Sequence, residues 1–486
     1  MSRRKSRRLK YFVVTILVAV LLVGVFFGFQ YVKKIGIFRV PGVVYYDESL
    51  SPEEKTKLEA IFTEDVELDK DVTISASISN TKPELAEDEL LTAVSVPVAD
   101  FYDVRNDIAE YEEGEYSYIP ISELDFTKKL LTIDKNYYLD TFDSGAIFRT
   151  IKFDSKNYEN EIKPLVEEQF SVGDLPSKDS VLTFAQTGVT ALSRGMNQKL
   201  VAVGGDATYF AEYIKDFLSG FDLTHTSNES SFTNLATSEN ICSDTRFIDT
   251  LTTIGLDIVE LTGNHNVDCG AEAAINSVDI YEQNNIRHVG GGKNAEDAAI
   301  PLQINEKNNG VTFLAYNLST GGATTGAAPG ANQYYEANAV EEINSARERG
   351  DFVVVDIQYY ECSAYASEYE DPACDRANSS AGDQIGFFRH LIDLGANMVV
   401  GTSAHQPQTY ELYGDGVIYY GLGNLFFDQY WWPGTTRSLV LGNYYYKNKL
   451  LQTKITPTVY DSSMQTKVLD EETAKWFLRR LVNVKP

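Results

Sequence analysis

The chain has 486 residues, and 70 Asp and Glu against 42 Lys and Arg give it a net charge of −28 at pH 7. This acid excess excludes broad electrostatic binding of nucleic acid, which needs basic surface to displace the counterions of the phosphates. With 43% hydrophobic and 12% aromatic residues, the chain can bury more than one core and is not a generally disordered protein.

The N-terminus predicts a membrane anchor. Six Lys and Arg in residues 1–10 precede the apolar segment 11–32, and Lys33 and Lys34 follow it. Its uncharged stretch of about 20 residues, at ~1.5 Å each, matches a hydrocarbon core of ~30 Å. Bulky residues stand where a signal peptide would need small ones for cleavage, so we expect an uncleaved anchor. The heavier basic cluster predicts that residues 1–10 stay in the cytoplasm and the bulk faces outward.

Two further regions follow the anchor. Residues 37–175 contain short apolar runs separated by acidic loops, which predicts an α+β region of unknown role. Strands and helices then alternate from 181 to 462. Strands are expected at VLTFAQTGV (181–189) and DIVEL (257–261), and helices at FAEYIKDFLSG (210–220) and AEAAINSVDIYEQN (271–284). This alternation is typical of an α/β fold with a layered, mostly parallel sheet. A C-terminal helix is expected within 463–486.

The chain has four cysteines, an even number that suggests disulfides in an oxidising compartment. The short spacing of Cys362 and Cys374 makes them the natural local pair, which leaves Cys242 with Cys269. Four cysteines allow three pairings, and all three stay open at this point. A zinc site is disfavoured because no CxxC spacing occurs.

Polar residues in the loops after the strands are the place to look for chemistry, because ligands of open α/β sheets bind beyond the carboxyl ends of the strands. Four residues in these loops could bind one divalent ion such as Mn²⁺, Zn²⁺ or Mg²⁺, namely Glu229, Asn264, His265 and His405. In that scheme His265 would be a general acid. The alternative is that these side chains satisfy backbone groups of tight loops. His225, in the same loop as Glu229, is an ambiguous addition to the set.

The residues in these loops resemble the bacterial poly-γ-glutamate capsule-synthesis proteins (the CapA family), whose domain is similar to calcineurin-type metallophosphoesterases. The resemblance covers about 181–462 and is strongest where a strand runs into GxxxH and on to YGLGNLFFD (420–428). It implies a four-layer α/β sandwich with a metal site at the strand exits.

Several site positions of the family are retained. Asn228 and Glu229 match its Asn-Leu-Glu motif in part, and the Asn-His pair stands as Asn264 and His265, with Asp268 after it. The resemblance assigns catalysis to His265 and Asp268, and metal binding to Glu229, Asn264 and His405. It places six further residues in the pocket, namely Asn228, Gln358, Glu361, Ser403, Asn424 and Asp428.

Other expected ligands are replaced. Val189 follows Gly188 where the family has an Asp, Gln358 stands for the His of His-Trp-Gly although Glu361 is retained, and Ser403 stands for the first His of Gly-x-His-x-His. Two metals held as in the parent fold are therefore not expected, and the replacements allow that no metal binds.

Two functions from different classes follow. The first is a weakly active or non-hydrolytic envelope protein that helps to synthesise, anchor or export a cell-surface polymer such as a poly-γ-glutamate capsule, together with capsule-synthesis membrane proteins. The second is an extracytoplasmic hydrolase of phosphoester or amide bonds that uses one metal. The sequence favours the first, because the ligand set is incomplete.

Overall fold

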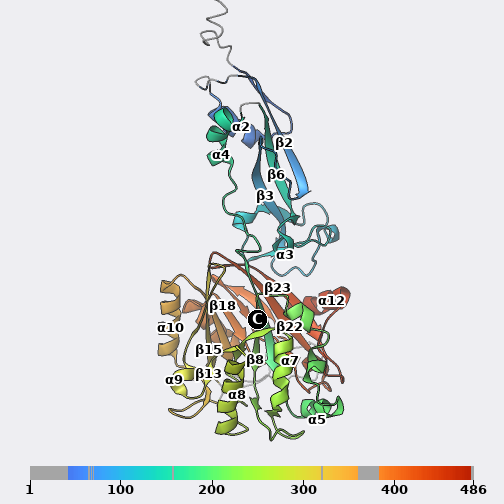
Figure 1. The fold of residues 1–486 in the computed structure, drawn as a ribbon, viewed down its shortest axis with the longest axis vertical. Coiled ribbons are helices and arrows are strands. Elements are labelled where there is room, and N and C mark those ends of the chain that lie inside the picture. The colour runs from blue at the N-terminus through green and yellow to red at the C-terminus, as the bar shows by residue number, and fades with distance from the viewer. Residues whose placement is uncertain are drawn as a thin grey trace, which may run out of the picture. The chain divides into compact units, whose positions relative to one another are not determined.

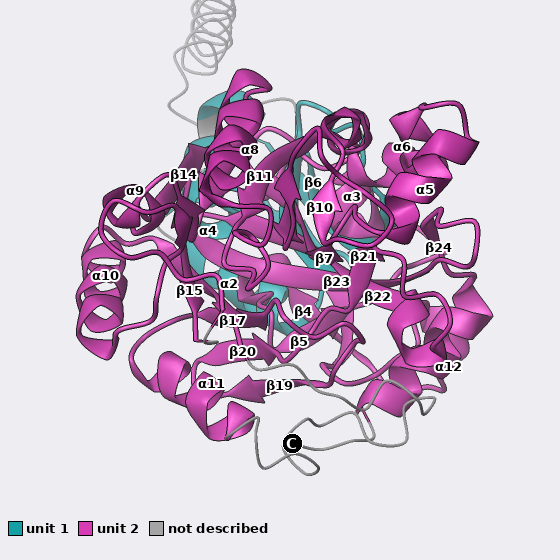
Figure 2. Cartoon of the chain, turned by 90° about the horizontal axis from the view of Figure 1, so that it is seen from below, with its two compact units in different colours: residues 1–95, 146–174 teal, residues 96–145, 175–486 magenta. Residues whose placement is uncertain are grey.

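The structure is a computed structural model that describes residues 42–63, 66, 68, 70–155, 158–318, 321–359 and 383–482 (Figure 1). The predicted cytoplasmic tail and the predicted anchor lie outside these residues. In the part of the chain that is described, no helix has the length and apolarity needed to cross a bilayer. The chain divides into two compact units, 1–95 with 146–174 and 96–145 with 175–486 (Figure 2).

Unit 1 packs two helices against a sheet with its own small core. Helix α2 begins with a capping box, in which Ser51 and Glu54 exchange hydrogen bonds with each other's backbone N–H. Arg149 of the sheet binds the same Glu54 through two nitrogens, at 2.5 and 2.6 Å. The core includes Leu58, Ile74 and Val166. The elements are β1 Val44–Tyr46, α2 Pro52–Ile61, β2 Val72–Thr81, β3 Glu89–Asp100, β6 Ser144–Asp154 and α4 Lys163–Phe170, with sheet order β1-β2-β6-β3.

The larger sheet of unit 2 has the order β12-β11-β8-β7-β22-β23-β24, and β21 also pairs with β7. Strands β7, β8, β11 and β12 are parallel, so their carboxyl ends meet at one edge. The hairpin of β22 and β23 continues the sheet in antiparallel fashion. The bounds are β7 Leu182–Thr190, β8 Leu223–Asn228, β11 Leu256–Glu260, β12 Arg287–Val289, β21 Asn424–Phe426, β22 Arg437–Tyr446, β23 Lys449–Val459 and β24 Lys467–Val468.

The second sheet of unit 2 has the order β14-β15-β17-β18-β20-β19. Its four central strands are parallel, whereas the edge strands β14 and β19 are antiparallel to their neighbours. The central strand FVVVDIQ is buried along its whole length, as expected for a parallel strand covered on both faces. The bounds are β14 Leu302–Glu306, β15 Asn309–Asn317, β17 Phe352–Gln358, β18 Met398–Gly401, β19 Tyr410–Tyr413 and β20 Gly416–Tyr419.

Three cores order unit 2 into layers of helices, sheet, sheet and helices. One core lies between the inner faces of the two sheets and contains Phe184 of β7 and Phe313 of β15, whose rings stack at 4.8 Å. The other two join each outer sheet face to its helices, which Figure 2 shows on opposite sides of the strands. The predicted α/β fold class is confirmed. The helices are α5 Gly195–Ala202, α6 Lys215–Leu218, α7 Ile248–Thr253 and α8 Ala271–Gln283 on one side, and α10 Glu336–Glu348 and α11 Gln384–Asp393 on the other.

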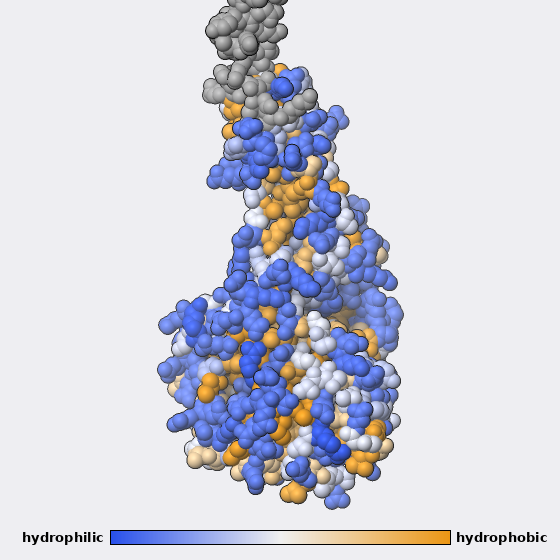
Figure 3. Space-filling model, viewed as in Figure 1, coloured by the Kyte–Doolittle hydropathy of each residue, from blue (hydrophilic) through white to orange (hydrophobic). Residues whose placement is uncertain are grey.

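Residues 96–145 belong to unit 2, so the two compact units share the region 37–175 between them. A single side chain shows how this segment is held. Gln452 of β23 accepts a hydrogen bond from the Leu130 N–H at 2.9 Å and donates to the carbonyls of Asp125 and Lys128. The segment contains β4 Ser117–Pro120, β5 Lys128–Leu130 and α3 Tyr138–Thr141, and helix α12 Glu471–Val482 lies near the C-terminus. On the face drawn in Figure 3, hydrophilic residues predominate and hydrophobic ones form small patches.

Candidate functional site

Polar side chains from four strand ends meet at one edge of the two sheets of unit 2. Glu229 follows β8, Asn264 lies in the loop after β11, Gln358 ends β17 and His405 lies in the loop after β18. The exposed fraction is 1% for Glu229, 1% for Gln358 and 3% for His405. Because the strands are parallel within each sheet, the fold itself brings these distant loops together.

The centre of the site is a buried acid beside an imidazole. Glu229 Oε2 lies 3.9 Å from His405 Nε2. On the other side of the ring, His405 Nδ1 lies 2.8 Å from Asn424 Oδ1. The amide group of Asn424 donates to the carbonyl of Thr435, which turns its oxygen toward the ring. Asn424 therefore holds a proton on Nδ1 and directs Nε2 toward Glu229.

Gln358 links two of the predicted ligands. Its Nε2 donates to Asn264 Oδ1 at 3.1 Å and reaches Glu229 Oε1 at 3.5 Å. The amide hydrogens of Gln358 therefore lie between a carboxylate and a carbonyl oxygen. The structure thus brings Glu229, Gln358 and His405, which are buried, and Asn264, which is half-buried, into one group.

Glycines make this convergence possible. A Cβ on Gly263, in the loop that carries Asn264, would lie 2.7 Å from the Glu229 Cα, closer than side chains pack. A Cβ on Gly188, at the end of β7, would lie 2.0 Å from the carbonyl oxygen of Gly423. Any larger residue at either position would push the loops apart. Val189, which stands where the family has an Asp, is itself buried.

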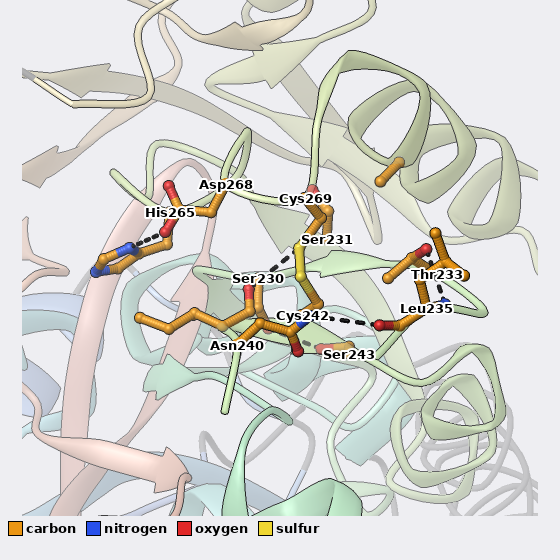
Figure 4. Close-up of a disulfide and its surroundings, with 12 residues drawn as sticks. Ser230, Ser231, Thr233, Leu235, Asn240, Cys242, Ser243, His265, Asp268 and Cys269 are labelled. Carbon is orange, nitrogen blue, oxygen red and sulfur yellow. Dashed lines mark hydrogen bonds and ion pairs between the residues drawn. A yellow bond between two sulfur atoms is a disulfide. The ribbon is translucent and has the colours of Figure 1, made fainter. Parts of the chain in front are cut away.

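The two residues predicted to be catalytic pair with each other. His265 Nδ1 lies 2.6 Å from Asp268 Oδ2, and the two side chains are 28% and 43% exposed. Figure 4 shows this pair next to the disulfide that joins Cys242 of strand β10 (Cys242–Ser243) to Cys269. His265 follows Asn264 directly in the chain, so the pair lies on the solvent-facing side of the loop that enters the buried group.

Asp428 is held by a basic residue that the sequence did not indicate. Arg194 Nη2 donates to Asp428 Oδ1 at 2.6 Å, and the N–H of Gly195 at the start of α5 donates to Oδ2 at 3.0 Å. The guanidinium also lies over the Phe427 ring, at 4.6 Å, and that ring contacts His405. The charge of Asp428 is therefore balanced by Arg194, and this ion pair holds Phe427 beside the imidazole of His405.

The three remaining residues predicted for the pocket, Asn228, Ser403 and Glu361, differ in their surroundings. Asn228 donates to the Ser230 carbonyl and so shapes the β8 exit. The hydroxyl of Ser403 is buried and has no hydrogen-bond partner among the described residues. Glu361 lies outside the described residues.

A second polar layer, which the sequence did not reveal, lies below the site between the two sheets. Asp356 of β17 accepts a hydrogen bond from Gln186 Nε2 at 2.6 Å, and its other oxygen lies 3.3 Å from His225 Nε2 without hydrogen-bond alignment. Glu260 of β11 is fully buried nearby, and burial, followed by the charge of Asp356, raises its pKa. The Phe313 ring stacks on the imidazole of His225. The sequence does contain one signal of this layer: Asp356 and Glu260 are charged residue types within otherwise apolar strands.

Replacing Glu260 by glutamine should stabilise unit 2 at neutral pH. A carboxyl with a raised pKa stabilises the fold while it is protonated, and this contribution is lost as pH rises from the unfolded value of ~4.3 through the folded pKa. Glutamine is neutral at every pH. We expect a gain of about 1–2 kcal/mol near pH 8 that vanishes near pH 4.5, measured by urea unfolding. Glu348→Gln, at an exposed position of α10, should leave the pH profile unchanged; equal profiles for both variants would contradict the prediction.

Residues 171–429 match the sequence family described as "Bacterial capsule synthesis protein PGA_cap", which is more than half of the chain. The chain belongs to this family.

Two curated relatives carry capsule names. The chain is 26% identical over 183 residues to "Capsule biosynthesis protein CapA" of Bacillus anthracis, covering 36% of this chain and 41% of that protein. It is 24% identical over 290 residues to "PGA biosynthesis protein CapA" of Bacillus subtilis (strain 168), covering 57% of this chain and 72% of that protein. The crystal structure of TT1561 of Thermus thermophilus aligns with 55% of this chain and 99% of its own, at 12% identity and a TM-score of 0.31.

The donors that the structure describes in this member of the capsule synthesis family are one acid, one imidazole and amide groups. No group of three or more His, Cys, Asp or Glu side chains gathers in a metal-binding arrangement within the described ranges. Glu229 and His405 are one acid and one imidazole, and the next group is Gln358, which directs hydrogens rather than an oxygen toward Glu229. A hard cation requires oxygen or nitrogen lone pairs on that side.

Proposed function

We propose that this chain is a membrane-anchored, extracytoplasmic protein that assists the synthesis, anchoring or export of a cell-surface polymer such as poly-γ-glutamate. It acts together with capsule-synthesis membrane proteins, and nucleic acid is not among its partners. In this proposal the buried site binds the polymer or its precursor without hydrolysing it. The alternative is a hydrolase of phosphoester or amide bonds that uses one Mn²⁺, Zn²⁺ or Mg²⁺ ion.

The bridge made by Gln358 is the observation that carries the non-hydrolytic proposal. It places an amide N–H group where a metal would sit, between the oxygens of Glu229 and Asn264. Neighbouring polar atoms are buried without a hydrogen-bond partner among the described residues, and such atoms call for a partner. They are Ser403 Oγ, Thr402 Oγ1 and Gln358 Oε1. Neutral hydroxyl and amide groups suit the amide links of a polymer better than its carboxylates, which Glu229 and the net charge of −28 would repel.

The proposed location rests on two features. The apolar segment 11–32, with its flanking basic residues, has the length and charge pattern of a single-pass anchor. The disulfide Cys242–Cys269 favours an oxidising compartment, because thiols in the cytoplasm are kept reduced. A chain that lacks residues 1–34 should be released from the membrane fraction, whereas the full chain should remain there and be cut by protease added to intact cells.

Replacing His405 by alanine should remove most of the surface polymer. The change leaves Glu229 buried without its imidazole and Asn424 without the group it orients, which should weaken ligand binding by about 1.5–3 kcal/mol, or ~10–150-fold. The measurement is the polymer retained on cells whose own copy has been deleted and replaced by the variant. His390→Ala, on α11 with its side chain 42% exposed, is the matched control and should retain normal capsule.

Metal analysis of the purified full chain separates the two functions. We expect metal well below one ion per chain after incubation with Mn²⁺, Zn²⁺ or Mg²⁺, and no hydrolysis of a phosphodiester or a γ-glutamyl amide. Stoichiometric metal that disappears in the His405→Ala variant, together with hydrolysis, would overturn the proposal in favour of the alternative.

A further inference from the structure

Unit 2 contains a cavity whose lining includes none of the residues of the strand-exit site that carries Glu229 and His405. It lies between the segment 96–145, strand β23 and helix α12, and has a volume of about 300 Å³. At ~30 Å³ for each water molecule, this equals about ten waters, which is enough for a small organic molecule. One wall is apolar and contains Phe101, Phe126, Leu130, Ile455, Pro457 and Leu478.

Four lysines line the cavity, and two of them are neutralised by carboxylates. Lys475 Nζ lies 2.6 Å from Glu110 and 2.8 Å from Glu471, and Lys454 Nζ lies 3.2 Å from Asp140. Because each of these ammonium groups has an acidic partner, neither requires an anion from outside the chain.

Lys128 and Lys129 form no ion pair with any described carboxylate. Lys129 Nζ donates one hydrogen bond, to the carbonyl of Asp103 at 2.8 Å, and the other two ammonium hydrogens have no acceptor within the described part of the chain. Burial lowers the pKa of Lys129 to about 8, although the charges of Asp103 and Glu110 act in the opposite direction. Lys129 is half-buried, and an anion would stabilise its partly desolvated ammonium group next to the apolar wall.

We propose that this cavity binds a small organic anion, a single carboxylate on an apolar body, with its head at Lys129 and its body against the apolar wall. A polyanion fits less well, because only two lysines lack acidic partners and the whole chain carries a charge of −28. A neutral apolar molecule would leave the ammonium hydrogens of Lys129 without acceptors. This site is separate from the strand-exit site and does not depend on the function proposed for it.

The test compares two ligands of the same size and shape, 2-naphthoate and 2-naphthamide, by titration calorimetry on the full chain in lipid nanodiscs. We expect 2-naphthoate to bind at least ~10-fold more tightly than the neutral amide, a difference of ~1.4 kcal/mol. Lys129→Met retains the apolar stem of the side chain and should remove this preference. Lys129→Arg should keep part of it.

Lys449→Met is the matched control, because Lys449 lies exposed at the start of β23 and does not line the cavity. It should bind 2-naphthoate as the unchanged protein does. Leu130→Trp, which fills the cavity, should abolish binding of both ligands, and circular dichroism should show that each variant is folded. Equal binding of the two ligands, no binding of either, or unchanged selectivity in Lys129→Met would each overturn the proposal.

Discussion

Replacing Asp356 by alanine is expected to lower the free energy of unfolding of unit 2 by about 3–5 kcal/mol. The carboxylate accepts a hydrogen bond from Gln186 and lies 3.3 Å from His225, and all three side chains are fully buried. Alanine would leave the amide hydrogens of Gln186 without their acceptor, would remove the carboxyl group beside the imidazole of His225, and would open a void between the two sheets. Urea unfolding followed by far-UV circular dichroism measures the loss.

A double variant isolates the reason for this loss. His225→Phe with Asp356→Leu replaces both polar partners by apolar ones, and the new ring would pack beside Phe184 and Phe313, which already contact the imidazole. Replacing both members of a buried polar pair by apolar residues often costs little, whereas removing only one of them is costly. We expect the double variant to be more stable than Asp356→Ala by at least ~2 kcal/mol. A double variant that loses as much as the sum of its single changes would show that this polar layer does not act as a unit.

Much of the fold of unit 2 could be predicted, because local pattern and tertiary environment agree there. The strand predicted at 257–261 occupies 256–260, and the helix predicted at 271–284 occupies 271–283. Parallel strands covered on both faces are continuous apolar runs, and the amphipathic helices between them keep the 3.6-residue period. The exits of these strands were consequently placed well enough to locate Glu229 and His405.

Helices with weak local signals were missed or misplaced. Helix α5 (195–202) was not predicted, because its sequence GMNQKLVA begins with glycine and buries only Met196, Asn197 and Leu200. The helix predicted at 210–220 is instead a 3-10 turn, η4 (Ala207–Ala211), followed by the short α6. Its apolar residues are buried as the pattern requires. The periodicity therefore identified the buried face, although it did not fix the hydrogen bonding of the backbone.

The sequence predicted which loops form the candidate site, but not which side chains in them contact each other. Asn264 and Gln358 are 94 residues apart in sequence, and their hydrogen bond depends on how the two sheets stack. The partners of Asp428 and Asp356 come from other strands and helices as well. Sequence periodicity reports which face of a strand is buried, but it does not identify the residue opposite. For this reason the polar layer around Asp356 and the cavity beside Lys129 became visible only in the structure.

Removing the disulfide Cys242–Cys269 is expected to cost about 3.5 kcal/mol of stability. This bond belongs to one of the three pairings that the sequence left open, and the structure contains it. Cys362 and Cys374 lie outside the described residues. The bond closes a loop of 27 residues that contains α7, β11 and the pair His265 and Asp268 (Figure 4). Without it the unfolded chain gains the freedom of an open loop, whereas the native contacts of the site remain.

The comparison is between the oxidised protein and the Cys242→Ser/Cys269→Ser variant, each unfolded in urea with and without dithiothreitol. Reduction should destabilise the oxidised protein by about the amount lost in the double variant, plus any effect that dithiothreitol has on the variant through Cys362 and Cys374. Because the loop carries His265 between the sheet and α8, limited proteolysis should cut the sequence TGNHNVD sooner once the bond is absent. Equal urea midpoints for the oxidised protein and the double variant would contradict the prediction. They would mean that tertiary packing alone fixes this loop and that the disulfide stabilises neither the loop nor the site.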